Sequence, residues 1–276
     1  VIVRSTPFGS EDLDAGPRLR VVGRHGVGVE NIDVDAATAR GVAVLNTAGA
    51  NADSVAEFAV MTAMMGLRRL GEVRRAWTDG ALEGGSFPGA LTRRGLIGRD
   101  LAGRTVGILG FGAIGRRVAA LCEAFGARVL FSDPFADPAD PRSRTPEALF
   151  PEADVLFLHM PLLDETRGMI DDRALGALPP DAVVVNAARA EIVDAGSMLR
   201  ALDAGVVAAY AVDVWSPEPP AADDPLVRHP RVIATPHMAA ITADALAAMS
   251  DSVVEGVRAF LSDAPDRSPV NGKELS

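Results

Sequence analysis

The sequence predicts an α/β fold with parallel sheets, divided into two domains. Short apolar runs alternate with segments of helical spacing over most of the 276 residues, as in chains built from βαβ units. Near the middle of the chain, at residues 104–116, a glycine-rich turn joins one apolar run to a helix. A β-α-β-α-β pattern precedes that turn, which indicates a smaller α/β domain ahead of a larger one.

The glycine-rich turn contains Gly110, Gly112 and Gly115 in the spacing G-x-G-x-x-G. The first glycine permits a tight turn, the second lets the backbone approach a pyrophosphate, and the third lets the helix pack against the strand. The start of the helix then faces the phosphates. This pattern favours a Rossmann-type, doubly wound dinucleotide-binding domain over the alternative, a cluster of turn glycines followed by an acidic strand end.

The strand after that helix ends in Asp133, 18 residues beyond Gly115. A carboxylate at this point accepts hydrogen bonds from the ribose of the adenosine and repels the additional phosphate of NADP. We therefore expect NAD to be the cofactor.

The composition excludes several classes of protein. With 48% hydrophobic and 23% charged residues the chain is typical of globular proteins. A formal charge of −10 and only 5% aromatic residues argue against nucleic acid or an anionic membrane as a partner. The single cysteine, Cys122, excludes an intrachain disulfide and a multi-cysteine metal site, and we expect no metal. No apolar run approaches transmembrane length and no signal peptide is visible, so a cytoplasmic location is the simplest expectation.

The chain begins directly in an apolar run, Val1-Ile2-Val3, without Met. Because a parallel sheet rarely begins with a bare strand, we expect an upstream strand and helix, about 30 residues in a βαβ unit, to be absent from this sequence.

Two arginines follow strands of the first half of the chain. The expected strands and helix lie at residues 1–3, 19–22, 42–45 and 31–40. Arg4 and Arg24 would converge on one edge of the sheet, where ligands of α/β proteins bind. The alternative is a pair of surface salt bridges, and the glycines around Arg24 favour the ligand there.

The rest of the chain supplies a long helix and the second sheet. A single apolar helix at residues 54–77 is expected to be buried or to lie in an interface, and residues 79–100 are expected to form a loop. Further strands are expected at residues 153–159, 181–186, 206–215 and 232–235, with helices at 166–178, 195–202 and 242–261, and a loose tail.

Three ionisable residues, Arg189, Glu218 and His237, follow expected strands in this second half. Hydride transfer to or from a hydroxy acid needs a cation for the carboxylate, an acid–base group for the oxygen, and a partner for that group. A guanidinium matches a carboxylate, and a histidine titrates near neutral pH. Each residue taken singly has an alternative: a salt bridge, a loop carboxylate, or a residue that begins a helix. Of the other histidines, His159 is expected beside the cofactor, His25 in the substrate pocket and His229 in a solvated loop.

The chain resembles the D-isomer-specific 2-hydroxyacid dehydrogenase family, most closely its D-3-phosphoglycerate dehydrogenase-like branch. The resemblance is carried by motifs that occur in the family's order over nearly the whole chain: Val3-Arg4-Ser5, VVGRHGVGVENID at 21–33, Ser54-Val55-Ala56-Glu57, the glycine turn, Asn186-Ala187-Ala188-Arg189, Asp213-Val214-Trp215 with Glu218-Pro219, and Thr235-Pro236-His237.

The resemblance implies a role for each of these residues. Arg189 would bind the carboxylate and the carbonyl oxygen, His237 would be the general acid–base, and Glu218 would pair with it. Asp213 would hold the nicotinamide carboxamide. Further residues would line the NAD site (Ala113, Ile114, Asp133, Met160 and Ala187) or match substrate-side positions (Arg4, Ser5, Arg24 and Gly26).

The resemblance also implies the domain plan. Residues 1–49 and the segment 241–276 would form a flavodoxin-like substrate domain, and residues 50–240 the NAD-binding domain. A homodimer through the cofactor domain is expected, with the helix from Ser54 in the interface. The expected activity is the interconversion of a D-2-hydroxy acid and its 2-keto acid.

The chain departs from the family pattern at several positions. The usual Arg-Gly is replaced by Arg189-Ala190-Glu191, and Glu30 replaces an aspartate. His25 stands where the phosphoglycerate enzymes carry a small residue. The sequence therefore does not identify which 2-keto acid is the substrate. The alternative function is a dinucleotide-sensing scaffold or corepressor on the same fold, although a sensor need not retain a general acid such as His237.

Overall fold

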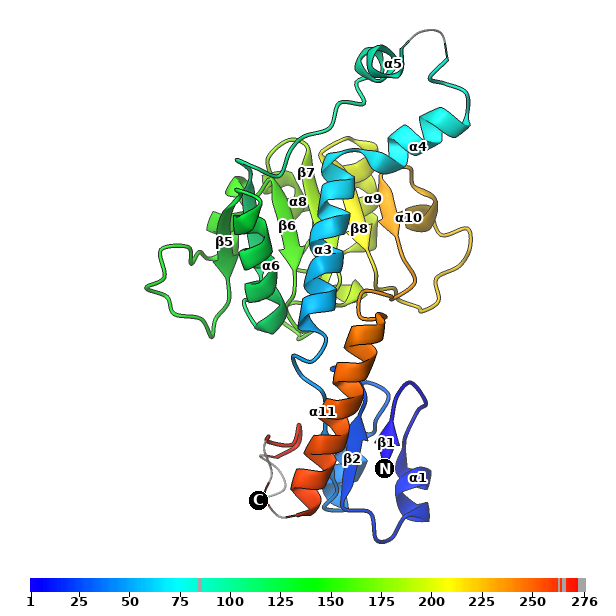
Figure 1. Cartoon of the computed structure of the whole chain (residues 1–276), viewed down its shortest axis with the longest axis vertical. Helices are drawn as coiled ribbons and strands as arrows, with labels where there is room; N and C mark the ends of the chain where they lie inside the picture. The colour runs from blue at the N-terminus through cyan, green and yellow to red at the C-terminus, as the bar shows by residue number, and fades with distance from the viewer. Residues whose placement is uncertain (84–85, 263, 265–266, 273–276) are drawn as a thin grey trace. The chain divides into compact units, whose positions relative to one another are not determined.

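The computed structural model describes residues 1–83, 86–262, 264 and 267–272. The chain divides into two compact units, Val1–Ser54 with Ala240–Ser276, and Val55–Ala239. Each unit contains a sheet of parallel strands with helices (Figure 1), which confirms the predicted α/β class. Of the predicted domain ranges, residues 84–85, 263, 265–266 and 273–276 lie outside the described residues.

The first unit has a three-stranded sheet in the order β1 (Ile2–Val3), β2 (Val21–Arg24), β3 (Ala43–Leu45). One face packs on α1 (Ser10–Ala15) and α2 (Val34–Ala39). The other face packs on α11 (Ala243–Leu261).

Gly23 explains why α11 lies so close to β2. A Cβ at this position would approach methyl groups of Val253 and Val257 to 2.7 and 2.8 Å. The absence of a side chain therefore allows the helix to pack directly on the strand.

The C-terminal tail is not loose where the structure describes it. Val270 donates its N–H to the carbonyl of Val44 at 2.7 Å. The carboxamide of Asn271 accepts from Val44 N and donates to Val42 O, both at 3.0 Å, and its side chain is buried. Asn271 thus takes the place of a neighbouring strand along the edge of β3.

The second unit has a six-stranded parallel sheet in the order β5-β4-β6-β7-β8-β9. The strands are β4 (Thr105–Leu109), β5 (Arg128–Ser132), β6 (Val155–Leu158), β7 (Ala182–Asn186), β8 (Val207–Val212) and β9 (Val232–Ala234). The chain passes from β4 to β5 on one side and returns to β6 on the other. The reversal beside β4 is the switch point at which doubly wound sheets bind their ligands.

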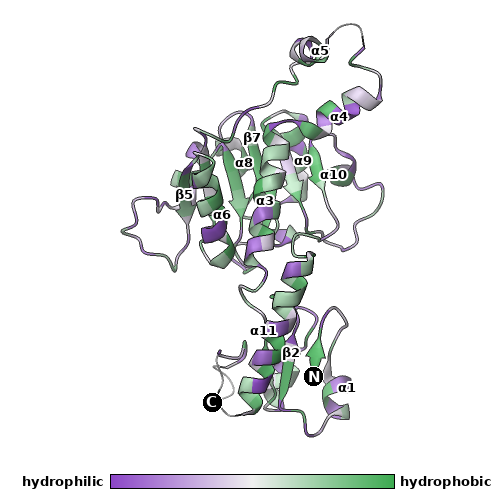
Figure 2. Cartoon of the chain, viewed as in Figure 1, coloured by the Kyte–Doolittle hydropathy of each residue, from purple (hydrophilic) through white to green (hydrophobic). Residues whose placement is uncertain are grey.

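Helices cover both faces of this sheet, and Figure 2 shows its strands in the colours of hydrophobic residues. One core lies between the sheet and helices α3 (Ala52–Leu67) and α6 (Ala113–Ala124). The other lies between the sheet and helices α8 (Asp172–Ala177) and α9 (Ala195–Asp203). The shorter elements are α7 (Pro146–Leu149), η1 (Phe150–Glu152), η2 (Ala190–Ile192) and α10 (Pro225–Arg228).

The prediction of one helix at residues 54–77 is wrong, as is that of a loop at 79–100. Arg69 adopts a left-handed backbone with φ 51°, which separates α3 from α4 (Leu70–Thr78). A further helix, α5 (Phe87–Arg93), lies within the expected loop. The rings of Trp77 and Phe87 meet edge to face at 6.2 Å and connect α4 with α5.

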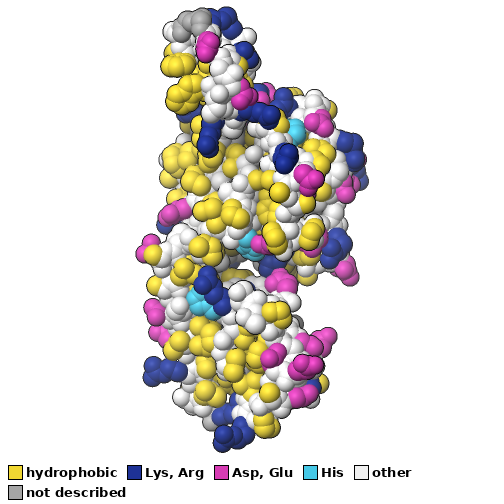
Figure 3. Space-filling view, turned by 90° about the vertical axis from the view of Figure 1, so that its right-hand side faces the viewer, with side chains coloured by type: hydrophobic (Ala, Val, Ile, Leu, Met, Phe, Trp, Pro, Cys, Tyr) yellow, Lys and Arg dark blue, Asp and Glu magenta, His cyan; other side chains and the backbone are white. Residues whose placement is uncertain are grey.

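Helix α4 has no buried residue among those described. Trp77, Phe87 and Ile97 are 63%, 58% and 60% exposed. Figure 3 shows hydrophobic side chains gathered on this end of the second unit. Within the described part of the chain, no helix is both long and apolar enough to cross a membrane.

Candidate functional site

The carboxyl edge of the six-stranded sheet collects most of the predicted site residues. The paired registers end at Ser132, Leu109, Leu158, Asn186, Val212 and Ala234 on neighbouring strands. The residues that follow these ends are, in the same order, Asp133, Gly110, His159, Ala187, Asp213 and Thr235. Four predicted cofactor residues therefore stand in one row, and Met160 lies one residue beyond it.

The glycine turn is shaped by the packing of the chain on itself. A Cβ at Gly110, where φ is 91°, would lie 2.6 Å from the backbone of His159. A Cβ at Gly115 would lie 2.1 Å from the carbonyl oxygen of Gly110. Gly110 and Gly115 are therefore required by the turn itself.

Gly112 differs from the other two glycines, because nothing lies within 4 Å of a Cβ built there. It is the residue before α6, and no side chain caps the free N–H groups at the start of that helix. An open backbone beside uncapped N–H groups is what a pyrophosphate needs. Ala113 and Ile114 form the first residues of this helix. The turn therefore fits a dinucleotide.

The Asp133 carboxylate connects the glycine turn to the loop after β5. One oxygen accepts from Phe111 N at 2.6 Å and the other from Phe135 N at 2.8 Å. Each carboxylate oxygen can accept a second hydrogen bond. The side chain thus remains able to accept from ribose hydroxyls.

Glu218 and His237 form a hydrogen-bonded pair. His237 Nδ1 lies 2.8 Å from Glu218 Oε1 and 3.0 Å from Oε2, and both side chains are about half exposed. Because a carboxylate can only accept, Nδ1 is the donor and Nε2 is the atom that faces other partners. The pair has the orientation that an acid–base histidine requires.

Arg189 lies three residues beyond the end of β7 and is partly buried. Asn186, at the end of that strand, donates to the carbonyl of Arg189 at 2.9 Å and accepts from Ala188 N at 3.0 Å. Asn186 therefore fixes the backbone that carries the arginine. The sequence prediction missed this role, although an asparagine at a strand end often forms such a local turn.

His159 directly follows β6, and both of its ring nitrogens are buried. No hydrogen-bond partner for them exists among the described residues. Its ring stacks on Phe157 with centroids 6.0 Å apart. Burial lowers the pKa of His159 to about 4. The ring is consequently neutral near pH 7. That His159 lies beside the cofactor stays a prediction.

The predicted substrate residues all lie in the first unit. Arg4 and Ser5 follow β1, where Asn31 Nδ2 donates to the carbonyls of Arg4 and Thr6. Asn31 thereby shapes the turn, a role that the sequence prediction missed.

Arg24, His25 and Gly26 follow the end of β2. Arg24 donates to the carbonyl of His25. Gly26 has φ 145°, and its N–H donates to Thr47 Oγ1 at 3.0 Å. His25 Nε2 lies 3.1 Å from Ser250 Oγ on α11, so one ring nitrogen is occupied within the unit.

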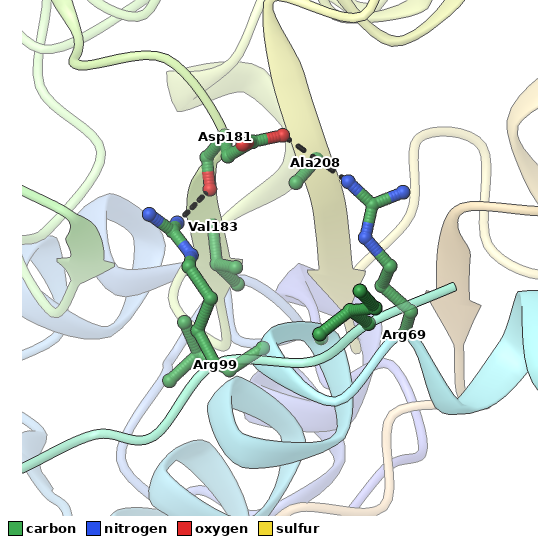
Figure 4. A pocket seen from close by; sticks show the side chains of 8 residues that line it. Arg69, Arg99, Asp181, Val183 and Ala208 are labelled. Carbon is green, nitrogen blue, oxygen red and sulfur yellow. Dashed lines mark hydrogen bonds and ion pairs between the residues drawn. The ribbon is translucent and has the colours of Figure 1, made fainter. Parts of the chain in front are cut away.

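A small hollow in the second unit is unrelated to these residues (Figure 4). It lies at the amino edge of the sheet, beside the start of β7. Arg69 pairs there with Asp181 at 3.2 Å, and Arg99 donates to the backbone carbonyl of Asp181. The arginines are held by acceptors of the chain itself, and none of the predicted site residues lines the hollow.

The described residues contain no group of three or more His, Cys, Asp or Glu side chains that could hold a metal ion. His229, expected to be solvated, is instead largely buried, with its ring 3.4 Å from Asp203.

Comparisons with known proteins identify the family of this chain. Residues 60–239 match the family model described as "D-isomer specific 2-hydroxyacid dehydrogenase, NAD binding domain". D-3-phosphoglycerate dehydrogenase of Archaeoglobus fulgidus is 35% identical over 98% of this chain and 51% of its own length. The Mycobacterium leprae enzyme of the same name is 38% identical over 99% of this chain and 51% of its own length. The chain thus spans about half the length of these curated relatives.

Solved structures show the same fold. D-2-hydroxyisocaproate dehydrogenase superposes with a TM-score of 0.86 at 27% identity, covering 98% of this chain and 86% of the other. An NAD+-bound 3-phosphoglycerate dehydrogenase of Entamoeba histolytica has a TM-score of 0.78 at 28% identity, with 98% and 82% covered. The family match confirms the prediction of NAD as cofactor. This chain belongs to the D-isomer specific 2-hydroxyacid dehydrogenase family.

Proposed function

We propose that this protein is an NAD-dependent dehydrogenase that interconverts a D-2-hydroxy acid and its 2-keto acid. The observation that carries the proposal is the Glu218–His237 pair, which follows β8 and β9 of the sheet that bears the glycine turn. A binding protein of this fold would have no need for a histidine oriented by a carboxylate.

NAD would supply the hydride acceptor or donor. Its pyrophosphate would lie over Gly112 and the start of α6, and its adenosine ribose would bind Asp133. Ala113, Ile114, Met160 and Ala187 are proposed to line the remainder of the cofactor site.

During reduction, His237 would donate a proton from Nε2 to the carbonyl oxygen of the keto acid. Glu218 holds the proton on Nδ1 and balances the charge of the protonated ring. The guanidinium of Arg189 would bind the substrate carboxylate and stabilise negative charge on the carbonyl oxygen. In the reverse direction neutral His237 would accept the hydroxyl proton.

The substrate would also contact Arg4, Ser5, Arg24, His25 and Gly26 at the end of the small sheet. Two arginines in this group favour a substrate with a second polar or anionic group. The names of similar proteins include D-3-phosphoglycerate dehydrogenase, D-2-hydroxyisocaproate dehydrogenase and glyoxylate reductase, so the substrate is proposed as a class.

A homodimer is part of the proposal. Helices α4 and α5 carry large exposed apolar side chains, including Trp77 and Phe87, which a second copy would cover. A cytoplasmic location is proposed from the use of NAD and from a chain whose one cysteine is free and buried.

The test is oxidation of NADH with a panel of 2-keto acids: glyoxylate, hydroxypyruvate, phosphohydroxypyruvate and bulkier acids. Substitution His237→Asn should lower kcat by about 10²-fold or more, with NADH affinity unchanged, because only the proton donor is lost. His229→Asn, a histidine paired with Asp203, serves as the matched control and should retain activity. NADH binding without turnover of any acid would contradict the dehydrogenase and favour the sensor.

A further inference from the structure

The turn that carries His237 has an unusual backbone. His237 adopts φ 54°, in the left-handed region that residues other than glycine rarely occupy. Such a conformation persists only where the surrounding structure enforces it. The side chain is held by Glu218, and a separate set of contacts must hold the backbone.

Asp213 provides those contacts. Its Oδ1 accepts from the Thr235 hydroxyl at 2.6 Å and from Met238 N at 2.8 Å, and its Oδ2 accepts from Ala239 N at 2.7 Å. All these donors belong to residues 235–239, which contain His237. Asp213 itself is 1% exposed.

Because Asp213 is buried, its carboxylate depends on these hydrogen bonds for its stability. A buried carboxylate is strongly unfavourable unless donors surround it, and here the donors come from the turn of His237. The turn and the charge therefore stabilise each other. Trp215 adds a bond from Nε1 to the carbonyl of Thr235 at 2.8 Å.

We infer that Asp213 is a positioning residue, which holds the left-handed turn of His237 so that the imidazole stays against Glu218. The family resemblance implies that Asp213 also holds the nicotinamide carboxamide. The described contacts of both oxygens are with the turn, and Oδ2, which accepts one of them, can accept a further hydrogen bond, so the two roles must be separated by experiment. The effect on catalysis rests on the proposed function, but the effect on the histidine does not.

Two substitutions separate the roles. Asp213→Asn would place an amide donor against a backbone N–H and disrupt the turn. Thr235→Val removes one donor from the turn and leaves the carboxylate in place for any cofactor contact. Thr235→Ser retains the hydroxyl that donates to Asp213 and should behave like the wild type in both measurements below. Asp194→Asn is the control, because that carboxylate caps the start of α9 through Ser197 N.

The first measurement needs no turnover. In the full chain without cofactor, the Nδ1 proton of His237 should give a downfield proton NMR signal that His237→Asn removes. We expect Asp213→Asn and Thr235→Val to weaken or abolish this signal, and Thr235→Ser and Asp194→Asn to keep it. An unchanged signal in both Asp213→Asn and Thr235→Val would overturn the inference.

The second measurement is NADH affinity by fluorescence, together with kcat on the best 2-keto acid. We expect Asp213→Asn to lower kcat at least 100-fold and Thr235→Val at least 5-fold, with NADH Kd changed less than 2-fold. A Kd raised 10-fold in Asp213→Asn, with the NMR signal and saturated kcat intact, would make Asp213 a cofactor ligand instead. If Asp213→Asn does not fold, the comparison of Thr235→Val with Thr235→Ser tests the positioning role by itself. If the wild type reduces no keto acid, the proposed function fails while the NMR arm still tests the positioning role.

Discussion

His159 follows β6 and His237 follows β9 at the carboxyl edge of one sheet, and their surroundings differ. His237 is half exposed and hydrogen-bonded to the carboxylate of Glu218. His159 is held neutral by burial, beside the aromatic ring of Phe157. The sequence distinguishes these two only through the motifs around them.

His159 should make stability depend on pH. Its folded-state pKa of about 4 lies below the ordinary value of 6.5, so the unfolded chain binds the proton more readily. The contribution of neutral His159 to the free energy of unfolding should therefore be complete above pH 6.5 and should decrease as the pH falls toward 4. At pH 5 the loss should be about 2 kcal/mol. Urea unfolding at pH 7.5 and 5.0 measures this difference. His159→Gln should reduce it by that amount, and an equal difference in both proteins would disprove the effect.

Asp133 should determine the choice between NAD and NADP. Asp133→Ala removes the charge that repels the ribose phosphate and also the bond to Phe111 N. We expect NADH affinity to fall about 10-fold and the NADH:NADPH ratio of Kd values to approach one. Asp137→Ala, on the same loop, is the control. An unchanged ratio would remove Asp133 from the ribose site.

At the scale of the element, the strand–turn–helix unit has two kinds of glycine. Gly115 is needed by the packing of α6 on the turn, whereas Gly112 leaves room for something outside the chain. The same substitution should therefore have different consequences at the two positions.

Gly112→Ala should leave the melting temperature nearly unchanged, because φ is −74° and the space is open. The added methyl group should raise the NADH Kd at least 10-fold. Gly115→Ala should instead destabilise the fold by about 2 kcal/mol, since the new Cβ would overlap the Gly110 carbonyl. Thermal unfolding and NADH titration separate the two effects. A Gly112→Ala protein with wild-type affinity would show that the pyrophosphate lies elsewhere.

The helices after residue 50 show where periodicity is insufficient. The break at Arg69 lies between Gly66 and Gly71, but an isolated glycine is tolerated inside a helix and does not specify where the helix ends. The break is stabilised by distant groups: Arg69 binds Asp181, and the carbonyl of Leu67 accepts from Arg99 N. A pattern read from neighbouring residues cannot contain those contacts.

At the scale of the whole molecule, α4 and α5 expose apolar side chains that a monomer would leave in water. We expect a dimer by light scattering at micromolar concentration. The double variant Trp77→Ser with Phe87→Ser should be monomeric, because the largest apolar contacts are removed. Phe135→Ser, at a residue 96% exposed on another loop, should leave the mass unchanged. A monomeric wild type, or a dimeric double variant, would contradict this assignment of the interface.

The sequence by itself determined the α/β class, the glycine turn, the strand-end positions of the site residues and the choice of NAD. These follow from local patterns of apolar residues and glycines, which neighbouring residues specify. Only the tertiary structure decided how those residues are held. Asp213 reaches the turn of His237 across 25 residues, and Asn271 closes the edge of β3 across 227. Such bonds depend on which strands lie side by side, and the fold of the whole unit is needed to bring their partners together.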